Sequence, residues 1–340
     1  MPPDPTTGAI ENKKEAPMEE NLELVSEWDK TFPQSDTVEH RKVTFHNRYG
    51  ITLAADLYTP KGVEGKLPAI AVSGPFGAVK EQSSGLYAQT LAERGFLTLA
   101  FDPSFTGESG GSPRYVASPD INTEDFQAAI DLLSVQENVD ADRIGVVGVC
   151  GWGGMALSAA AIDTRIKATV TSTMYDMTRV NAEGYFRSED SEEARHAKRE
   201  AMNAQRTEDY RTGEYALVGG LPPAVPDEAP QFLKDYVDYY KTDRGYHARS
   251  VNSNGGWTVT TALSFLNMPL LAYAAEIRNP VLLVHGDKAH SYYFSQDAYA
   301  KLTGDNKELL TIEGASHTDL YDQVDIIPFD KIAAFFAESL

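Results

Sequence analysis

Residues 144–154 read IGVVGVCGWGG, and the rest of the chain is organised around this stretch. Its isoleucine and three valines are branched apolar residues, typical of a strand that is buried on both faces. The glycines that follow indicate a sharp turn, and the small apolar residues of 155–161 are typical of a helix packed on a sheet. The sequence therefore predicts a strand, a tight turn and a helix, with Cys150 at the corner.

A side chain at such a corner projects clear of the backbone, and the helix N-terminus behind it favours a thiolate over a thiol. Side chains at Gly148, Gly151 or Gly153 would obstruct so tight a turn. Gly148-x-Cys150 matches the first half of the G-x-S-x-G nucleophile motif, with cysteine in place of serine, but Trp152 stands where the second glycine belongs. The alternative interpretation is that Cys150 is a buried small hydrophobic residue on an ordinary glycine-rich turn.

Length, charge and cysteine content restrict the class of protein. A chain of 340 residues with 42% hydrophobic content can bury one large core, which favours one catalytic domain with an inserted subdomain. The formal net charge of −20 argues against nucleic acid and anionic membranes as partners, because phosphate binding requires clustered Lys and Arg. No apolar run approaches the length of a membrane span. The single cysteine excludes an intrachain disulfide and favours a cytoplasmic location, although a signal peptide that had been removed would leave no trace.

Alternating strand and helix patterns predict an α/β fold with a mostly parallel sheet and helices on both faces. Residues 1–38 form a polar arm with one short helix at 22–28, and residues 39–175 and 278–340 form the core. The segment 176–277 is too long for a simple connection, so we interpret it as a helical cap inserted after the sixth strand. The strands are expected at 41–46, 51–58, 68–73, 96–101, 144–149, 166–172, 281–285 and 308–312.

Three polar residues follow strand ends, where catalytic groups gather in such sheets. Cys150, Asp287 and His317 come in the chain order nucleophile, acid, histidine, which is that of α/β-hydrolase triads. His317 would take the thiol proton or hold a thiolate in an ion pair, and Asp287 would fix the imidazole tautomer. The acid is commonly placed three residues after the strand-end glycine, where this chain has an alanine, so Asp176 and Asp319 are alternative acids.

An oxyanion hole needs two backbone N–H groups. One is expected at Gly151, directly after the nucleophile, and the other in the loop after the third strand. Pro75 has no N–H, so Phe76 or Gly77 must serve there, and we favour Phe76. No spacing of His, Cys and carboxylate residues suggests a metal site, and no cofactor is expected.

Aromatic residues of the cap could line a substrate pocket above the nucleophile. We expect Tyr185, Tyr236 and Trp257 there, together with Trp152 from the turn itself. Most aromatic residues of the cap are expected only to pack it.

Four motifs resemble the dienelactone-hydrolase-like branch of the α/β-hydrolases. They are GVCGWGG (148–154), the stretch 78–111 from AVKEQ to GESGG, GDKAHSYYFS (286–295) and GASHTDLYD (314–322). The similarity extends from about residue 40 to the end of the chain. This chain departs from dienelactone hydrolases proper in its large cap and in the tryptophan of the first motif.

The resemblance implies an eight-stranded, mostly parallel sheet and ester or thioester hydrolysis through a covalent acyl-enzyme. By the same match, Cys150 is the nucleophile, Asp287 the acid and His317 the base, while Gly151 and Phe76 provide the oxyanion hole.

The leading hypothesis is a hydrolase that cleaves a small carboxylic ester, lactone or thioester through an acyl-cysteine. The alternatives are an acyltransferase, in which the cap excludes water, a peptidase-like relative, and a binding protein that keeps the cysteine for packing. The expected partner is a small-molecule acyl substrate, and homo-oligomers are left open.

Overall fold

The computed structural model describes residues 20–340 and contains one eight-stranded sheet. The strand order is β1-β2-β4-β3-β5-β6-β7-β8, with β1 and β2 antiparallel to their neighbours and every other pair parallel. The strands are β1 (Val38–His46), β2 (Thr52–Pro60), β3 (Leu67–Ser73), β4 (Leu97–Phe101), β5 (Val139–Val149), β6 (Ile166–Ser172), β7 (Val281–Gly286) and β8 (Lys307–Ile312). The predicted α/β-hydrolase architecture is thereby confirmed.

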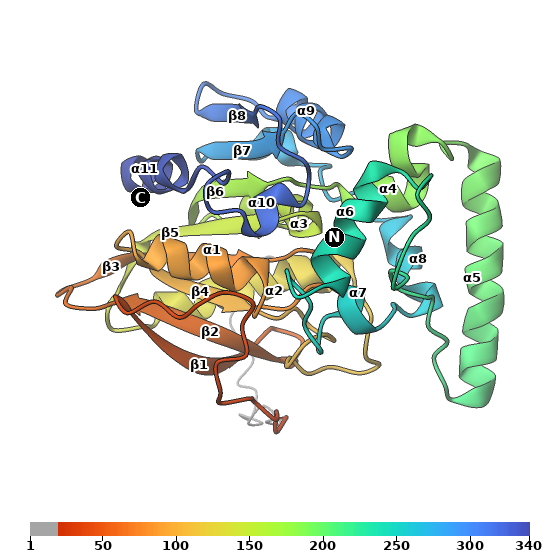
Figure 1. Ribbon diagram of the computed structural model, residues 1–340, viewed down its shortest axis with the longest axis horizontal. Helices are drawn as coiled ribbons and strands as arrows, with labels where there is room; N and C mark the ends of the chain where they lie inside the picture. The colour runs from red at the N-terminus through yellow and green to blue at the C-terminus, as the bar shows by residue number, and fades with distance from the viewer. Residues whose placement is uncertain (1–19) are drawn as a thin grey trace, which may run out of the picture.

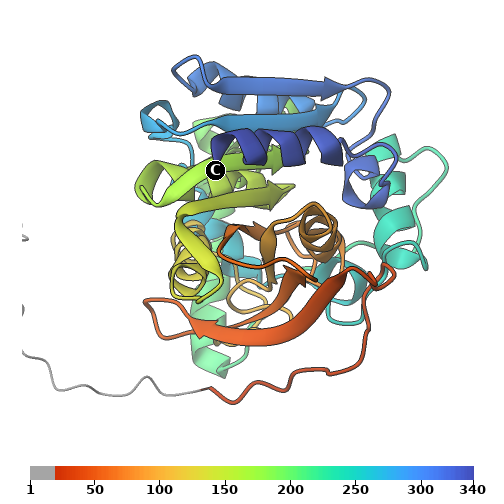
Figure 2. The same ribbon diagram turned by 90° about the vertical axis from the view of Figure 1, so that its left-hand side faces the viewer.

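Helices cover both faces of this sheet (Figures 1 and 2). On one face α1 (Ser83–Ala92) and α11 (Phe329–Ser339) pack together, and on the other α2 (Pro119–Ser134) packs beside α3 (Gly151–Ile162). The helix α9 (Tyr292–Lys301) packs on β7 and β8. Because both faces are covered, the central strands are apolar along their whole length: β4 is buried at every residue.

A helical insertion connects β6 to β7, as expected. Its longest helix, α5, lies apart from the sheet at one end of the molecule (Figure 1). The insertion contains α4 (Met177–Glu183), η1 (Tyr185–Arg187), α5 (Glu192–Thr212), α6 (Gln231–Lys241), α7 (Val251–Asn254), η2 (Val259–Thr261), α8 (Ala262–Phe265) and η3 (Ala274–Glu276). The boundaries of the insertion as a separate domain stay a prediction.

The N-terminal segment differs from the expectation. The helix predicted at 22–28 is wrong, because residues 20–37 run without any helix. The backbone N–H of Val25 instead donates to the Glu108 carboxylate at 2.7 Å, and the indole of Trp28 donates to the carbonyl of Phe32 at 2.9 Å. These tertiary contacts stabilise an extended backbone more than a helix of seven residues would be stabilised by its own hydrogen bonds, because short helices are only marginally stable. Residues 1–19 of the predicted arm lie outside the described residues.

Across residues 20–340 every helix is too short or too polar to cross a lipid bilayer.

Candidate active site

Cys150 occupies the corner between β5 and α3, with φ of 58° and ψ of −126°. A positive φ is strained for a residue with a side chain, and such strain is typical of a nucleophile held at a strand-to-helix turn. Hydrogen bonds on both sides fix this backbone: the N–H of Cys150 donates to Ser172, and its carbonyl accepts from Tyr175, each at 2.9 Å. The thiol is 6% exposed and faces a cavity.

The glycines around the corner are required by close approach, as the sequence predicted. A Cβ on Gly148 would lie 2.2 Å from the carbonyl oxygen of Trp152, and one on Gly153 would lie 2.4 Å from the Cβ of Met174. Both distances are far below van der Waals contact, so only glycine fits.

The two predicted pocket tryptophans lie elsewhere. Trp152 is buried in the core, where its ring meets those of Phe101 and Phe126 at centroid distances of 5.8 and 5.6 Å. Its assignment to the pocket is therefore wrong: the side chain of the second residue of α3 packs in the core and does not line the cavity beside Cys150. Trp257 instead packs on the outside of the Phe76 ring at 4.5 Å and does not line the cavity beside Cys150.

His317 lies in the loop after β8, 2% exposed, with hydroxyl groups on both ring nitrogens. Its Nδ1 is 2.6 Å from Oγ of Ser291 and 2.8 Å from Oγ1 of Thr173. Its Nε2 is 2.9 Å from the hydroxyl of Tyr321. The imidazole is thus oriented firmly, but by neutral groups.

The candidate acids use their carboxylates elsewhere. Asp287 accepts the N–H of Gly314 at 2.8 Å, because its backbone continues the pairing of β7 with β8 and turns the side chain over that loop. Asp176 caps the N-terminus of α4, and Asp319 accepts a backbone N–H three residues before it. Within the described residues none of the three hydrogen-bonds His317, so the structure does not bring Asp287 to the imidazole, contrary to the expectation.

The pKa values of Cys150 and His317 also argue against a resting pair of thiolate and imidazolium. Burial raises the pKa of the Cys150 thiol to about 11, and the Tyr321 hydroxyl and the N–H groups of Phe76 and Gly151 offset this only in part. Burial likewise lowers the pKa of His317 well below its usual value, with smaller contributions from two nearby histidines. The expected thiolate is therefore not the resting form: both groups are neutral near pH 7.

The N–H groups of Phe76 and Gly151 both lie close enough to Sγ of Cys150 to lower the pKa of its thiol. Their role as oxyanion donors stays a prediction. The insertion holds the loop that carries Phe76: Asn252 of α7 donates from its side chain to the Phe76 carbonyl at 2.7 Å, and the Ser250 hydroxyl donates to the Gly77 carbonyl at 2.9 Å.

A mostly apolar cavity of about 200 Å³ opens beside Cys150. The tyrosines predicted for the pocket, Tyr185 and Tyr236, both line it. The remaining lining comes from the core and from the insertion: Phe76, Tyr175, Met177, Val180, Leu221, Leu233, Tyr240, Asn252 and Tyr321. The site thus lies where the insertion covers the carboxyl ends of the parallel strands.

Comparison with known families agrees with this geometry. The model of a protein family described as X-Pro dipeptidyl-peptidase (S15 family) matches residues 49–319 of this chain. This span includes Cys150, the insertion and His317. The chain belongs to the S15 family. It is accordingly an enzyme of the α/β-hydrolase class, whereas the narrower resemblance to dienelactone hydrolases stays a prediction.

Three relatives of this S15 member are informative. The protein PA2218 of Pseudomonas aeruginosa is 63% identical over 94% of this chain and 86% of its own length. Its crystal structure matches with a TM-score of 0.92 and 61% identity over 95% of this chain and all of that chain. YcjY of Escherichia coli is 35% identical over 88% of this chain and 99% of its own. Thiohydrolase aneE of Aspergillus aculeatus is 33% identical, over only 39% of this chain and 41% of its own.

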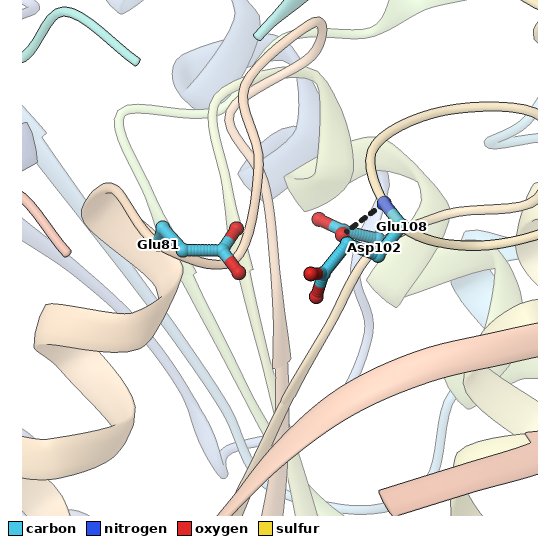
Figure 3. A group of neighbouring side chains, drawn as sticks. All are labelled: Glu81, Asp102 and Glu108. Carbon is cyan, nitrogen blue, oxygen red and sulfur yellow. Dashed lines mark hydrogen bonds between the residues drawn. The ribbon is translucent and has the colours of Figure 1, made fainter. Parts of the chain in front are cut away.

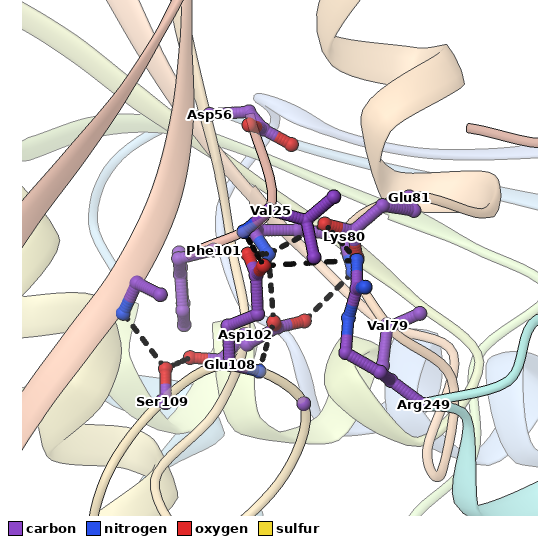
Figure 4. Close-up of polar contacts among 12 residues, drawn as sticks. Val25, Asp56, Val79, Lys80, Glu81, Phe101, Asp102, Glu108, Ser109 and Arg249 are labelled. Atoms are coloured by element: carbon purple, nitrogen blue, oxygen red, sulfur yellow. Dashed lines mark hydrogen bonds and ion pairs between the residues drawn. The ribbon is translucent and has the colours of Figure 1, made fainter. Parts of the chain in front are cut away.

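The S15 chain also contains a buried ionic cluster in the loops that follow β3 and β4 (Figures 3 and 4). Carboxylate oxygens of Glu81, Asp102 and Glu108 lie within 4.8 Å of one another, a spacing that could hold a metal ion. The Nζ of Lys80 lies among them, 2.6, 2.9 and 2.5 Å from one oxygen of each. A lysine ammonium therefore provides the positive charge that these carboxylates need.

Four residues of this S15 site escaped the sequence analysis: Thr173, Ser291, Tyr321 and Asn252. Ser291 and Tyr321 lie in two of the motifs that carry the resemblance, and the alanine at the usual acid position was a signal that another group orients His317. Asn252 belongs to the insertion, and no local pattern connects it to the loop after β3.

Proposed function

We propose that the protein hydrolyses a small carboxylic ester, lactone or thioester through an acyl-Cys150 intermediate, with His317 as the base. The observation that carries this proposal is the placement of the thiol: it lies on a strained corner, beside two backbone N–H groups and a linked imidazole, at one wall of an apolar cavity. Membership of a hydrolase family and the similarity to a protein named as a thiohydrolase support the same chemistry.

The reaction would begin when Sγ of Cys150 attacks the acyl carbon and the thiol proton passes to His317. The carbonyl oxygen, as it becomes negative, accepts the N–H groups of Phe76 and Gly151, each worth about 3 to 4 kcal/mol in such a hole. His317 then returns the proton to the leaving group. A water molecule that gives its proton to His317 releases the acid and restores the thiol.

The cavity limits the acyl group. A volume of about 200 Å³ with mainly aliphatic and tyrosine walls accommodates a short-chain or single-ring acyl group. Within the described residues the hydroxyl of Tyr240, 1% exposed, has no hydrogen-bond partner, so a polar substituent on the acyl group would satisfy it. A thiolate leaves more readily than an alkoxide or an amine, so thioesters and activated esters suit a cysteine better than peptides do.

The proposal is tested with purified wild type and the variants Cys150→Ala and His317→Ala on short-chain and aromatic nitrophenyl esters and thioesters. We expect turnover by the wild type, loss of at least about 10³-fold in kcat/KM in both variants, and an acyl adduct on Cys150 by intact mass. His196→Ala, a change on the exposed face of α5, is the matched control and should behave as wild type. Undiminished turnover in Cys150→Ala rules the proposal out.

The fate of the adduct separates hydrolysis from acyl transfer. Both catalytic side chains are almost fully buried, which restricts access of water. Release of free acid with water as the sole acceptor supports hydrolysis. An adduct that persists until a thiol or amine is added indicates a transferase.

A further inference from the structure

We propose that Tyr321 is a catalytic residue that passes the thiol proton of Cys150 to His317. Its hydroxyl is 2.9 Å from Nε2 of His317. Tyr321 also lines the same cavity as Cys150, and its hydroxyl lies close enough to the thiol to lower the pKa of Cys150. Among the hydrogen-bond partners of His317 in the described residues, Tyr321 is the one that lines the cavity beside Cys150. The inference deepens the proposed function and rests on it for the chemical step.

Packing fixes the position of this hydroxyl. Tyr321 is fully buried in the short helix α10 (Asp319–Asp322), one turn after His317. Its ring makes edge contacts with those of Tyr239 and His317, at centroid distances of 5.0 and 5.3 Å. A side chain held on two sides has little freedom to swing away, so the bridge is a permanent feature of the site.

The hydrogen bonds behind His317 set the direction of proton transfer. Ser291 Oγ lies 2.6 Å from Nδ1 of His317 and 2.9 Å from Nε2 of His285, whose Nδ1 is 2.6 Å from Oγ of Ser295. One arrangement satisfies every member of this chain with Nε2 of His317 free to accept. In it Nδ1–H of His317 donates to Ser291, the Ser291 hydroxyl donates to His285, and His285 donates to Ser295.

In that arrangement the transfer balances without a charged tyrosine. The S–H bond of Cys150 breaks and a new O–H bond forms on Tyr321, while the original O–H bond of Tyr321 breaks and an N–H bond forms at Nε2 of His317. As the proton moves, the sulfur electron pair forms the C–S bond and the carbonyl π pair moves to oxygen, which leaves a neutral tyrosine and an imidazolium. The leaving group then receives the proton by the reverse path.

The surroundings suit a neutral relay. Burial raises the pKa of Tyr321 well above its usual value, so it keeps a proton at any pH of assay. The other titratable groups that face this site are Tyr175, Tyr185, Tyr236, Tyr240, His285 and His290. Burial raises the pKa of each of these tyrosines, and it lowers the pKa of His285 to about 3 and that of His290 to about 4, so all are neutral near pH 7.

Tyr321→Phe tests the inference because it removes one oxygen and keeps the ring. The control is Tyr239→Phe, a neighbouring buried tyrosine whose ring touches Tyr321 but whose hydroxyl faces neither reacting group. Since Cys150 is the single cysteine, its alkylation by iodoacetamide can be followed by intact mass across a pH series. We expect Tyr321→Phe to slow alkylation at neutral pH by at least about tenfold and to shift the profile to higher pH, with no change in Tyr239→Phe.

Catalysis gives a second readout that a structural role would not move. With the best ester, kcat/KM should fall about 10²-fold in Tyr321→Phe. In the wild type the rate should depend on the fraction of D₂O along a curve, because two protons move in the same step. In Tyr321→Phe this dependence should be linear. His317→Gln should slow alkylation to a similar extent, and the double variant should be no slower than either single one, because both act on one proton path.

Equal alkylation profiles for wild type and Tyr321→Phe, with matching circular dichroism, overturn the inference. So does a double variant whose losses multiply. If the wild type turns over no ester or thioester, the proposed function fails, but the alkylation profiles still decide the role of Tyr321 because they require only the thiol.

Discussion

At the scale of single residues, Cys150 and His317 form an uncharged pair. Burial raises the pKa of the thiol and lowers that of the imidazole, and the neighbours of Nδ1 are the hydroxyls of Ser291 and Thr173. A carboxylate at Nδ1 would stabilise an imidazolium by charge, whereas hydroxyls fix only its orientation. Proton transfer must therefore accompany attack by sulfur instead of preceding it.

This difference predicts that substitutions at Ser291 and Thr173 lower the activity more than a substitution at Asp287. Ser291→Ala should lower kcat/KM by about tenfold, and Ser291→Ala with Thr173→Val by about 10²-fold, since the imidazole loses the groups that set its tautomer. Asp287→Asn should stay within about twofold of wild type, because its carboxylate binds the loop at Gly314. Steady-state kinetics on the best ester measure all three.

One outcome would contradict this prediction. If kcat/KM falls as far in Asp287→Asn as in the Ser291 and Thr173 double variant, the Asp287 carboxylate reaches His317 when substrate is bound.

At the scale of elements, local sequence patterns predicted the strands, which depend mainly on local sequence. Each expected strand is present within a few residues of its predicted bounds, because runs of branched apolar residues such as those of β5 need no distant partner to be recognised. The helix expected at 22–28 is absent, since Glu108 and Phe32 satisfy that backbone and indole through contacts that the pattern does not contain.

The site was predictable in part for the same reason. Cys150 and Gly151 follow from the backbone geometry of a strand-to-helix corner, which the glycines encode. Phe76 follows from the loop after β3, where Pro75 has no N–H to donate. The orientation of His317 depends on which side chains surround it after folding, and Tyr321 became visible only as a contact between rings and hydroxyls.

The helix α7 of the insertion acts on the oxyanion loop through Asn252. Asn252→Ala should lower kcat about tenfold, less than the 10² to 10³-fold of a deleted donor, because the N–H of Phe76 is misaligned but still present. Asn254→Ala, at the exposed end of the same helix, is the matched control. A fall in kcat of equal size in both variants would point to a general loosening of α7 and against a specific hold on the loop.

At the scale of the whole molecule, the cluster around Lys80 joins parts of the chain that are distant in sequence. Glu81 lies in the loop just before α1, Asp102 directly follows β4, and Glu108 also accepts the N–H of Val25 from the N-terminal segment. Arg249, from the insertion, lies 2.9 Å from Glu81 (Figure 4). The core, the insertion and the N-terminal segment thus share one buried network.

Lys80→Met should therefore destabilise the whole protein. Removing the ammonium leaves buried carboxylates without their main counter-charge, at a cost of about 3 to 5 kcal/mol in the free energy of unfolding. Lys66→Met, at an exposed position, should cost less than about 0.5 kcal/mol. Urea unfolding followed by circular dichroism measures both, and equal midpoints for the two variants would show that the network does not hold the fold together.

The pH dependence of the same experiment should also change. In the wild type the pKa values of Glu81 and Glu108 are lowered despite burial, chiefly by Lys80, whereas burial raises the pKa of Asp102. The stabilising contribution of the two glutamates is therefore present above the unfolded value of 4.5 and is lost as pH falls. Without Lys80, burial dominates and raises these folded pKa values above the unfolded ones, so the folded state binds more protons and loses stability as pH rises from about 5 to 7.5. Lys80→Met should thus unfold at a higher urea concentration at the lower pH, and an unchanged slope against pH would mean that Arg249 and the remaining cations replace the missing charge.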